Sequence, residues 1–188
     1  MKKIFLMLIF IASIFAAENS LQKGVYRGTG ELSVAVFDGQ KTQWYELKTP
    51  ETDYQKLGDI QIGSVVEFES EGEGDGKKAF NIKQIAPRSE RAELCDEKNA
   101  EFAAGFLNAD DVNLRLKPSL KGKAYMLQGG KSDEFIVKSQ PISDGQNSWY
   151  EIVHWRGVDA PTLYVVAKFV ETAPLCADDV EYINEFLK

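Results

Sequence analysis

Apolar and polar positions alternate in short segments of the N-terminal half of the chain. Leu32, Val34 and Val36 recur at every second position, which is the spacing of a β-strand with one buried face. Asp38 and the glycine after it form a turn signal, so residues 42–47 are expected as the returning strand. The pattern therefore predicts a β-hairpin rather than a helix at the start of the chain's folded part.

A second hairpin is predicted directly after the first. Residues 64–69 and 79–85 supply its strands, and the glycine-rich, charged segment 71–76 supplies its tip. Residues 50–63, which contain glycine and proline, are expected as a loop or a short helix between the two hairpins. Four or five strands in this region are enough for a small barrel or a curled sheet.

The second hairpin resembles the last hairpin of an OB-fold barrel of the cold-shock type. The resemblance rests on Ile62-Gly63-Ser64-Val65-Val66-Glu67-Phe68-Glu69 and on the returning Ala79-Phe80-Asn81-Ile82-Lys83-Gln84-Ile85. It implies a small OB-like β-barrel over residues 22–88. It does not extend to nucleic-acid binding, because residues 18–90 hold nine basic and thirteen acidic residues and no interleaved run of aromatic and basic side chains.

Short strands are also predicted throughout residues 105–175. Val112 and Leu114 alternate with polar residues until Pro118 stops the strand. Further segments rich in β-branched and aromatic residues follow at 135–137, 149–153 and 164–170. The fold class expected for the whole chain is therefore mainly β, with two small β-barrels, OB-like and then SH3-like.

These C-terminal segments resemble a bacterial SH3 (SH3b) domain in their order and spacing. The matching motifs are Val112-Asn113-Leu114-Arg115, Lys117-Pro118-Ser119, Leu127-Gln128-Gly129-Gly130, Trp149-Tyr150-Glu151-Ile152 and Tyr164-Val165 through Phe169-Val170. The sequence departs from the family at Leu163, where a glycine is usual, and in the long loop from His154 to Thr162. The resemblance implies a small barrel that binds peptides or peptidoglycan stems.

Two segments that flank the second barrel have helical character. Residues 89–104 are expected as a linker, either helical or extended, because Ser89 can cap a helix and several alanines follow. Residues 176–188 are expected as a short C-terminal helix, since Val180 and Ile183 share one face at helical spacing with the apolar residues at 186 and 187. A helix this short needs a neighbouring domain to pack against.

The first seventeen residues have the order of a secretory signal peptide. Lys2 and Lys3 precede an apolar run over 4–15, and Ala16 and Ala17 supply small residues at the expected cleavage site. The run is too short for a membrane-spanning helix, which needs about 20 residues. We therefore expect export to the periplasm with residues 1–17 cleaved, or secretion beyond it; an uncleaved N-terminal anchor is the alternative.

The charge of the chain limits the classes of molecule that it can bind, and its cysteine content indicates the cellular compartment. Without Lys2 and Lys3, the mature chain holds 20 basic and 29 acidic residues, a net charge of −9, which argues against nucleic acid and anionic membranes. Cys95 and Cys176 are expected to pair, because exported proteins with two cysteines often form disulfides, whereas two free thiols are the alternative. The SH3-like resemblance supports the pairing, since the ends of such a barrel lie near each other.

The candidate ligand-binding residues are aromatic. If Tyr150 and Ile152 face the core, strand alternation places Trp149 outward. Trp149, Tyr164 and Trp155 would then form an aromatic groove with Glu151, of the kind in which SH3-like barrels bind peptides. The alternatives are that Trp149 caps the barrel core and that Trp155 is tucked under its own loop.

No catalytic motif accompanies these residues. His154 is the only histidine and has no triad partners nearby in the sequence, and no metal-ligand spacing or phosphate-binding loop is present. The sequence therefore predicts a non-catalytic binding or adaptor protein without a cofactor, whose SH3b-like domain engages a peptide or peptidoglycan. An interaction or inhibitor protein that binds a periplasmic protein is the alternative, and a wall hydrolase is disfavoured because residues 18–90 contain no cysteine or histidine.

Overall fold

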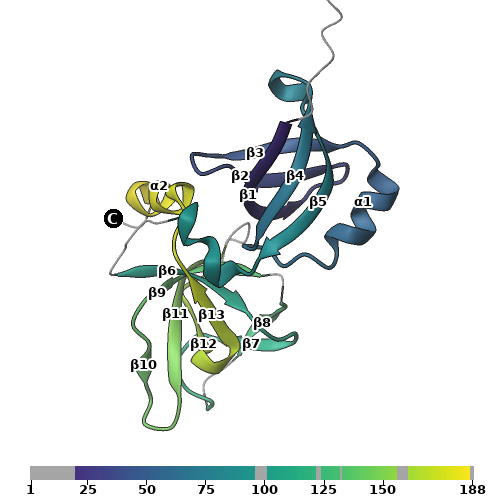
Figure 1. The fold of residues 1–188 in the computed structure, drawn as a ribbon. Coiled ribbons are helices and arrows are strands. Elements are labelled where there is room, and N and C mark those ends of the chain that lie inside the picture. Colours follow the sequence, from purple (N-terminus) through teal and green to yellow (C-terminus); the bar gives the residue numbers. More distant parts are fainter. Residues whose placement is uncertain (1–19, 96–100, 122–123, 132, 156–160, 187–188) are drawn as a thin grey trace, which may run out of the picture.

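The computed structural model describes residues 20–95, 101–121, 124–131, 133–155 and 161–186. It confirms the expected fold class: the chain is mainly β, with two sheets and a short C-terminal helix (Figure 1). The predicted signal segment 1–17 lies outside the described residues. Within the described ranges, no helix is both long and apolar enough to cross a membrane.

The first sheet is a closed barrel of five strands in the order β1-β2-β3-β5-β4. Strands β3 and β5 pair in parallel, whereas the other neighbours are antiparallel, and helix α1 connects β3 to β4. The closed five-stranded sheet agrees with the small barrel expected here, since the hairpin pattern allowed either a small barrel or a curled sheet. Its elements are β1 (Ser20–Thr29), β2 (Ser33–Phe37), β3 (Thr42–Leu47), α1 (Pro50–Leu57), β4 (Val65–Glu71), the 3-10 helix η1 (Gly74–Gly76) and β5 (Lys78–Ala86).

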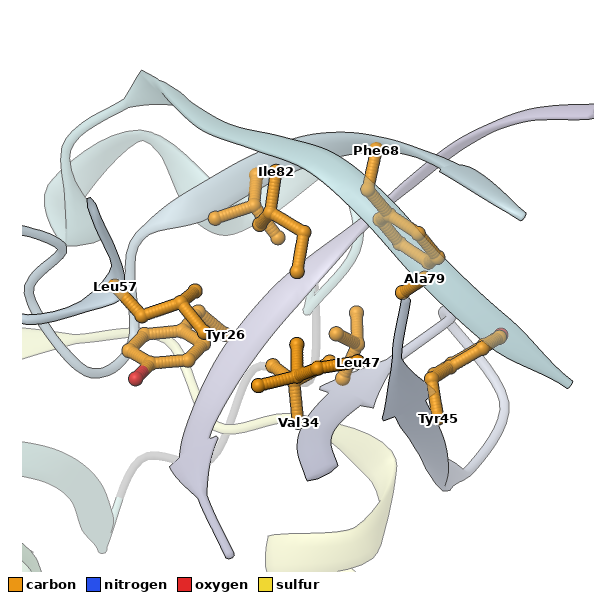
Figure 2. Packing of buried hydrophobic residues seen from close by; sticks show 10 residues of the cluster. Tyr26, Val34, Tyr45, Leu47, Leu57, Phe68, Ala79 and Ile82 are labelled. Carbon is orange, nitrogen blue, oxygen red and sulfur yellow. The ribbon is translucent and has the colours of Figure 1, made fainter. Parts of the chain in front are cut away.

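The interior of this barrel is filled by side chains from every strand and from α1 (Figure 2). Tyr45 and Phe68 meet edge to face with their ring centroids 5.0 Å apart, and Leu57 brings α1 onto the core. Helix α1 is held at its start by Thr49, whose hydroxyl donates to Asp53 Oδ2 at 2.8 Å, and by Pro50 in its first turn. The barrel therefore folds around its own hydrophobic core, whose buried members are Tyr26, Val34, Val36, Tyr45, Leu47, Leu57, Val66, Phe68, Ala79 and Ile82.

The second sheet has eight strands, in the order β13-β6-β9-β11-β12-β7-β8 with β10 paired to β11. Buried residues from β6, β7, β9, β11 and β12 share one core, so the sheet curls around it in a barrel-like way. The strands are β6 (Phe102–Leu107), β7 (Val112–Arg115), β8 (Ala124–Gly129), β9 (Glu134–Lys138), β10 (Ile142–Ser143), β11 (Ser148–Trp155), β12 (Leu163–Val166) and β13 (Val170–Ala173), with the 3-10 helix η3 (Ala167–Phe169) between the last two.

The segment between the two sheets differs from the expected linker. In the described part of this segment, Arg88–Glu93 forms the 3-10 helix η2, and the strand β6 already begins at Phe102. β6 pairs with β9 on one side and β13 on the other, so it is an interior strand of the second sheet. Its alanines suggested a helix, but pairing on both edges outweighs such a weak helical preference.

The C-terminal helix α2 (Ala177–Phe186) packs against the second sheet, as its apolar spacing predicts. Ile183 is buried and Val180 is partly buried, both against a cluster that includes Phe102 and Phe106. The helix is capped at its start, because Asp179 Oδ2 accepts the backbone N–H of Cys176 at 2.9 Å. The side chains at 186 and 187 lie outside what the structure describes.

A buried ion network joins the two sheets. Arg27 of β1 donates from Nη1 to Glu134 Oε1 of β9 at 2.6 Å, and from Nη2 to Asp178 Oδ1 of α2 at 2.6 Å. Asp179 Oδ2 lies 3.3 Å from the same Nη2. Burial lowers the pKa of Arg27, but the carboxylates of Glu134, Asp179 and Asp178 more than offset this, so its pKa is raised and it stays charged.

The 3-10 helix η2 lies between the two sheets and contacts β4 of the first and β13 of the second. Arg91 donates from Nε and Nη2 to the carbonyl oxygen of Pro174, at 2.8 and 2.6 Å. The guanidinium groups of Arg88 and Arg91 lie 4.5 and 5.1 Å from the centroid of the Phe106 ring. Gly63 of the first barrel approaches the same ring so closely that an added Cβ would lie 2.5 Å from Phe106 Cζ.

A disulfide between Cys95 and Cys176 closes the junction and confirms the predicted pairing. It ties the end of the η2 segment to the start of α2, with 81 residues of sequence separation. Both cysteines are buried against Val25 and Phe37 of the first barrel. The bridge therefore fastens the second sheet and α2 to the first barrel as well as closing the second unit.

We expect the double variant Cys95→Ser/Cys176→Ser to lower the free energy of unfolding by about 2–4 kcal/mol, because the long loop gains conformational freedom in the unfolded chain. Urea denaturation followed by circular dichroism measures the change. The wild type in reductant should match the double variant; equal stability of oxidised and reduced wild type would contradict a stabilising role for the bridge.

We expect Arg27→Met to lower the free energy of unfolding by about 3–5 kcal/mol, because Glu134 and Asp179 then stay buried without their main cation. Lys23→Met is the matched control on the same strand, since Lys23 pairs with Glu93 at the surface, 2.7 Å away. That exposed pair contributes little to stability. Similar denaturation midpoints for the two variants would show that the buried network does not hold the sheets together.

Candidate functional site

Trp149 is not on the surface, contrary to the sequence-based prediction. Its side chain is fully buried, with 0% exposure. The residue lies opposite Val166 of β12 and Ile142 of β10, and η3 also lies against β11. The face of β11 that carries Trp149 is therefore covered as well as the face that carries Ile152. The interpretation of Trp149 as an outward groove residue is therefore wrong.

Trp155 is buried as well, which favours the alternative of a tucked side chain. Its ring meets Phe135 edge to face, with centroids 5.7 Å apart, and belongs to the core of the second sheet. His154 stacks on Tyr182 of α2 with ring centroids 4.0 Å apart. These neighbouring side chains thus secure β11 to the core and to the C-terminal helix.

Tyr164 and Glu151 lie close together, but they do not form an aromatic groove with Trp149 and Trp155, which are buried. They are cross-strand partners on β12 and β11, and Glu151 Oε1 lies 3.0 Å from Lys138 Nζ of β9. Burial and the charge of Glu151 raise the pKa of Tyr164, while Lys138 acts in the opposite direction. The result is a partly exposed polar cluster in which Glu151 is already paired.

A surface that the sequence analysis did not select lies around Leu120. This leucine is 56% exposed and lines two adjoining hollows. The first hollow, of about 190 Å³, is mostly apolar and is lined by Asp110, Asp111, Val112, Asn113, Arg115, Leu120, Val166 and Phe169. The second, of about 420 Å³, is lined by Ser119, Leu120, Lys121, Asp144, Gly145 and Gln146. We name the two hollows together the Leu120 groove.

Local hydrogen bonds hold Leu120 in this position. The backbone N–H of Ser119 donates to the Lys117 carbonyl at 2.8 Å, and the N–H of Lys121 donates to Ser119 Oγ at 3.2 Å. Arg115 Nη1 donates to the Leu120 carbonyl at 3.2 Å. The turn of the Lys117-Pro118-Ser119 motif therefore fixes the backbone and leaves the leucine side chain to solvent.

The second hollow of the groove contains the negatively charged side chain of Asp144. Asp144 Oδ1 accepts the backbone N–H groups of Asn147 and Gln146, at 2.7 and 2.9 Å. These bonds lower the pKa of Asp144, so its carboxylate is ionised at neutral pH. With Lys121 and Arg115 nearby in the lining, the groove offers both charge signs around an apolar centre.

One group of side chains in the described ranges has metal-ligand proximity: Cys176, Asp178 and Asp179. Its sulfur is in the disulfide, and both carboxylates contact Arg27. The group therefore serves the junction between the sheets and does not offer free ligands to a metal.

Comparisons of the chain with models of protein families, with curated proteins and with solved structures found no match. The functional argument for this protein therefore rests on its own geometry and on the sequence motifs.

The burial of the three tryptophans predicts their fluorescence. Trp44 is exposed, whereas Trp149 and Trp155 are buried. We expect Trp44→Phe to remove most of the emission that acrylamide quenches and to shift the remaining spectrum to shorter wavelength, because buried indoles are shielded from water. Trp149→Phe should instead remove shielded emission. A larger loss of quenchable emission from Trp149→Phe would contradict the buried position of that side chain.

Proposed function

We propose that this chain is an exported, non-catalytic binding protein with an SH3b-type second unit that engages a peptide or a peptidoglycan stem. The observation that carries the proposal is the exposed Leu120 side chain between two hollows of the second sheet. An apolar side chain held out to solvent in a concave, mixed-charge setting is typical of a recognition surface.

The chemistry of the groove suits a stem peptide. Such a peptide carries free carboxylates, amines and small apolar side chains. Arg115 and Lys121 can donate hydrogen bonds to the carboxylates of the peptide, and Asp144 can accept one from its amine. Leu120 and Phe169 can cover its methyl groups. The Lys117-Pro118-Ser119 turn belongs to the motifs that resemble SH3b domains, so the groove lies in the part of the chain on which the resemblance rests.

The groove residues supply polar groups that can bind a peptide. They provide amide, carboxylate, guanidinium and ammonium groups, and the Ser119 hydroxyl accepts the backbone N–H of Lys121. The Cys95–Cys176 disulfide is compatible with the oxidising periplasm to which the N-terminal signal points. The proposal therefore keeps the expected compartment and moves the ligand surface from the buried tryptophans to Leu120.

We expect Leu120→Ser to weaken binding of a purified disaccharide–tetrapeptide muropeptide by about tenfold, because a leucine contact worth about 1.4 kcal/mol is lost. Isothermal titration calorimetry of the chain from residue 18 onward measures the affinity. Leu21→Ser is the matched control, since Leu21 is also an exposed leucine, 66% against 56% for Leu120, and lies on β1 outside the groove.

The proposal fails if the folded wild type gives a flat titration, or if both serine variants bind as tightly as the wild type. A flat titration would favour the alternative function, an interaction or inhibitor protein for a periplasmic protein.

A further inference from the structure

The first barrel carries a second exposed apolar surface, separate from the Leu120 groove. Trp44 of β3 is 59% exposed, and Leu32, in the turn between β1 and β2, is 61% exposed. Large apolar side chains are normally found singly on a protein surface, and a cluster of them beside a hollow marks a binding site. The alternating pattern placed Leu32 on the buried face with Val34 and Val36, but β2 begins at Ser33 and Leu32 lies exposed before it. No part of the proposed function accounts for Leu32 or Trp44.

The two side chains belong to one continuous surface. Along β3, Tyr45 and Leu47 are buried, so Trp44 and Glu46 share the outer face. The indole lies across Gly30, where an added Cβ would be 3.2 Å from Trp44 Cζ3. Gly30 is followed directly by Glu31 and Leu32, so the ring stands beside that turn.

A hollow of about 450 Å³ lies beside Glu46, which shares the outer face of β3 with Trp44. It is lined by Glu31, Leu32, Ser33, Glu46, Leu47 and Pro50. We name this hollow, together with the ring of Trp44, the Trp44 surface. The lining combines the aliphatic residues Leu32, Leu47 and Pro50 with the carboxylates of Glu31 and Glu46, whereas the Leu120 groove contains both charge signs.

The two carboxylates of this lining are not neutralised. Other glutamates of the same barrel form ion pairs with lysines, at 2.6 Å for Lys48–Glu71 and 2.7 Å for Lys83–Glu67. In the part of the chain that the structure describes, no cation lies within 4.0 Å of Glu31 or Glu46. This holds although Lys78 is the cross-strand neighbour of Glu46.

We propose that the Trp44 surface binds a lysine- or arginine-bearing extended peptide segment of a partner protein. A basic side chain meets every feature of the surface. Its aliphatic stem packs on Leu32 and Pro50, and its cationic end lies over the indole, the aromatic group with the strongest cation–π attraction, and between Glu31 and Glu46. The neighbouring apolar residue of the peptide fills the rest of the hollow above Leu47.

Charge selects this occupant over other partners. Phosphate backbones are repelled by two free carboxylates, which excludes nucleic acid. A second copy of this chain is disfavoured as well, because the mature chain carries a net charge of −9 (20 basic and 29 acidic residues). A basic segment is attracted both by these carboxylates and by the field of the whole protein.

The test uses fluorescence anisotropy with a labelled, amidated peptide that repeats Gly-Lys-Leu-Lys. The comparison peptide carries acetyl-lysine at each lysine position, which removes the charge and keeps the stem. We expect the lysine peptide to bind and the acetylated peptide to bind at least tenfold more weakly. Trp44→Ala should weaken binding of the lysine peptide about five- to tenfold, and Trp44→Phe less.

The matched controls separate this site from general attraction to an acidic protein. Glu31→Gln/Glu46→Gln should weaken binding at least tenfold. Glu73→Gln/Glu90→Gln, which removes two exposed charges from the β4–β5 hairpin and from η2, should change it less than twofold. Leu120→Ser should leave it unchanged, so the result is independent of the proposed peptidoglycan groove.

Three outcomes overturn the proposal. They are no binding of the lysine peptide to the folded protein, equal losses in the two glutamine variants, and equal binding of the acetylated peptide. An oligomer of N-acetylglucosamine that quenches Trp44 emission while the lysine peptide fails would replace the peptide with a sugar as the ligand.

Discussion

The relative orientation of the two units of this protein depends on Arg27. This residue lies on a strand of the first barrel, and its charged side chain is buried in the junction between the units. Its guanidinium contacts Glu134 of β9 and Asp178 and Asp179 of α2, so one side chain joins the first barrel, the second sheet and the C-terminal helix. A buried charge of this kind is costly unless it is paired. The two units must therefore meet in one orientation for the network to be satisfied.

Other elements of the junction reinforce the same constraint. Asp179 has two roles, because its carboxylate also accepts the N–H of Cys176 and so caps α2. Cys176 in turn is fixed to Cys95 at the end of the η2 segment, whose Arg91 binds the carbonyl of Pro174. All three interactions, the disulfide, the helix cap and the ion network, involve residues just before or at the start of α2. Loss of one should therefore weaken the others.

The sequence predicted the parts of the fold that local patterns determine. Alternation located the hairpins of the first barrel, and the apolar spacing of Val180 and Ile183 correctly marked the C-terminal helix α2. The start of β6 was missed because its neighbours β9 and β13 are distant in sequence, and its own alanines give no strand signal. Arg27 was missed for a related reason: a single arginine in a strand has the same pattern whether its partners are water or distant carboxylates.

The candidate site shows a further limit of the period-of-two argument. Alternation tells which side chains of β11 share a face, but it cannot tell whether the second face is covered, and for Trp149 it is. The sequence does hold a signal for Leu120, because this residue directly follows the Lys117-Pro118-Ser119 turn. A residue in such a turn belongs to no strand that would direct its side chain into the core. An apolar residue in a proline-containing turn is a better sequence signal of exposure than an aromatic residue in a central strand.

The junction also bears on how the two proposed surfaces would work together. The Trp44 surface belongs to the first barrel and the Leu120 groove to the second sheet, and their lining residues do not overlap. Because the ion network and the disulfide fix one unit against the other, a ligand held at one surface is kept at a set position relative to the other. A rigid protein with these two proposed binding surfaces would suit the role of an adaptor that holds a basic protein segment beside a cell-wall component. A flexible linker would lose that advantage, since the effective concentration of the second site falls when its position is averaged.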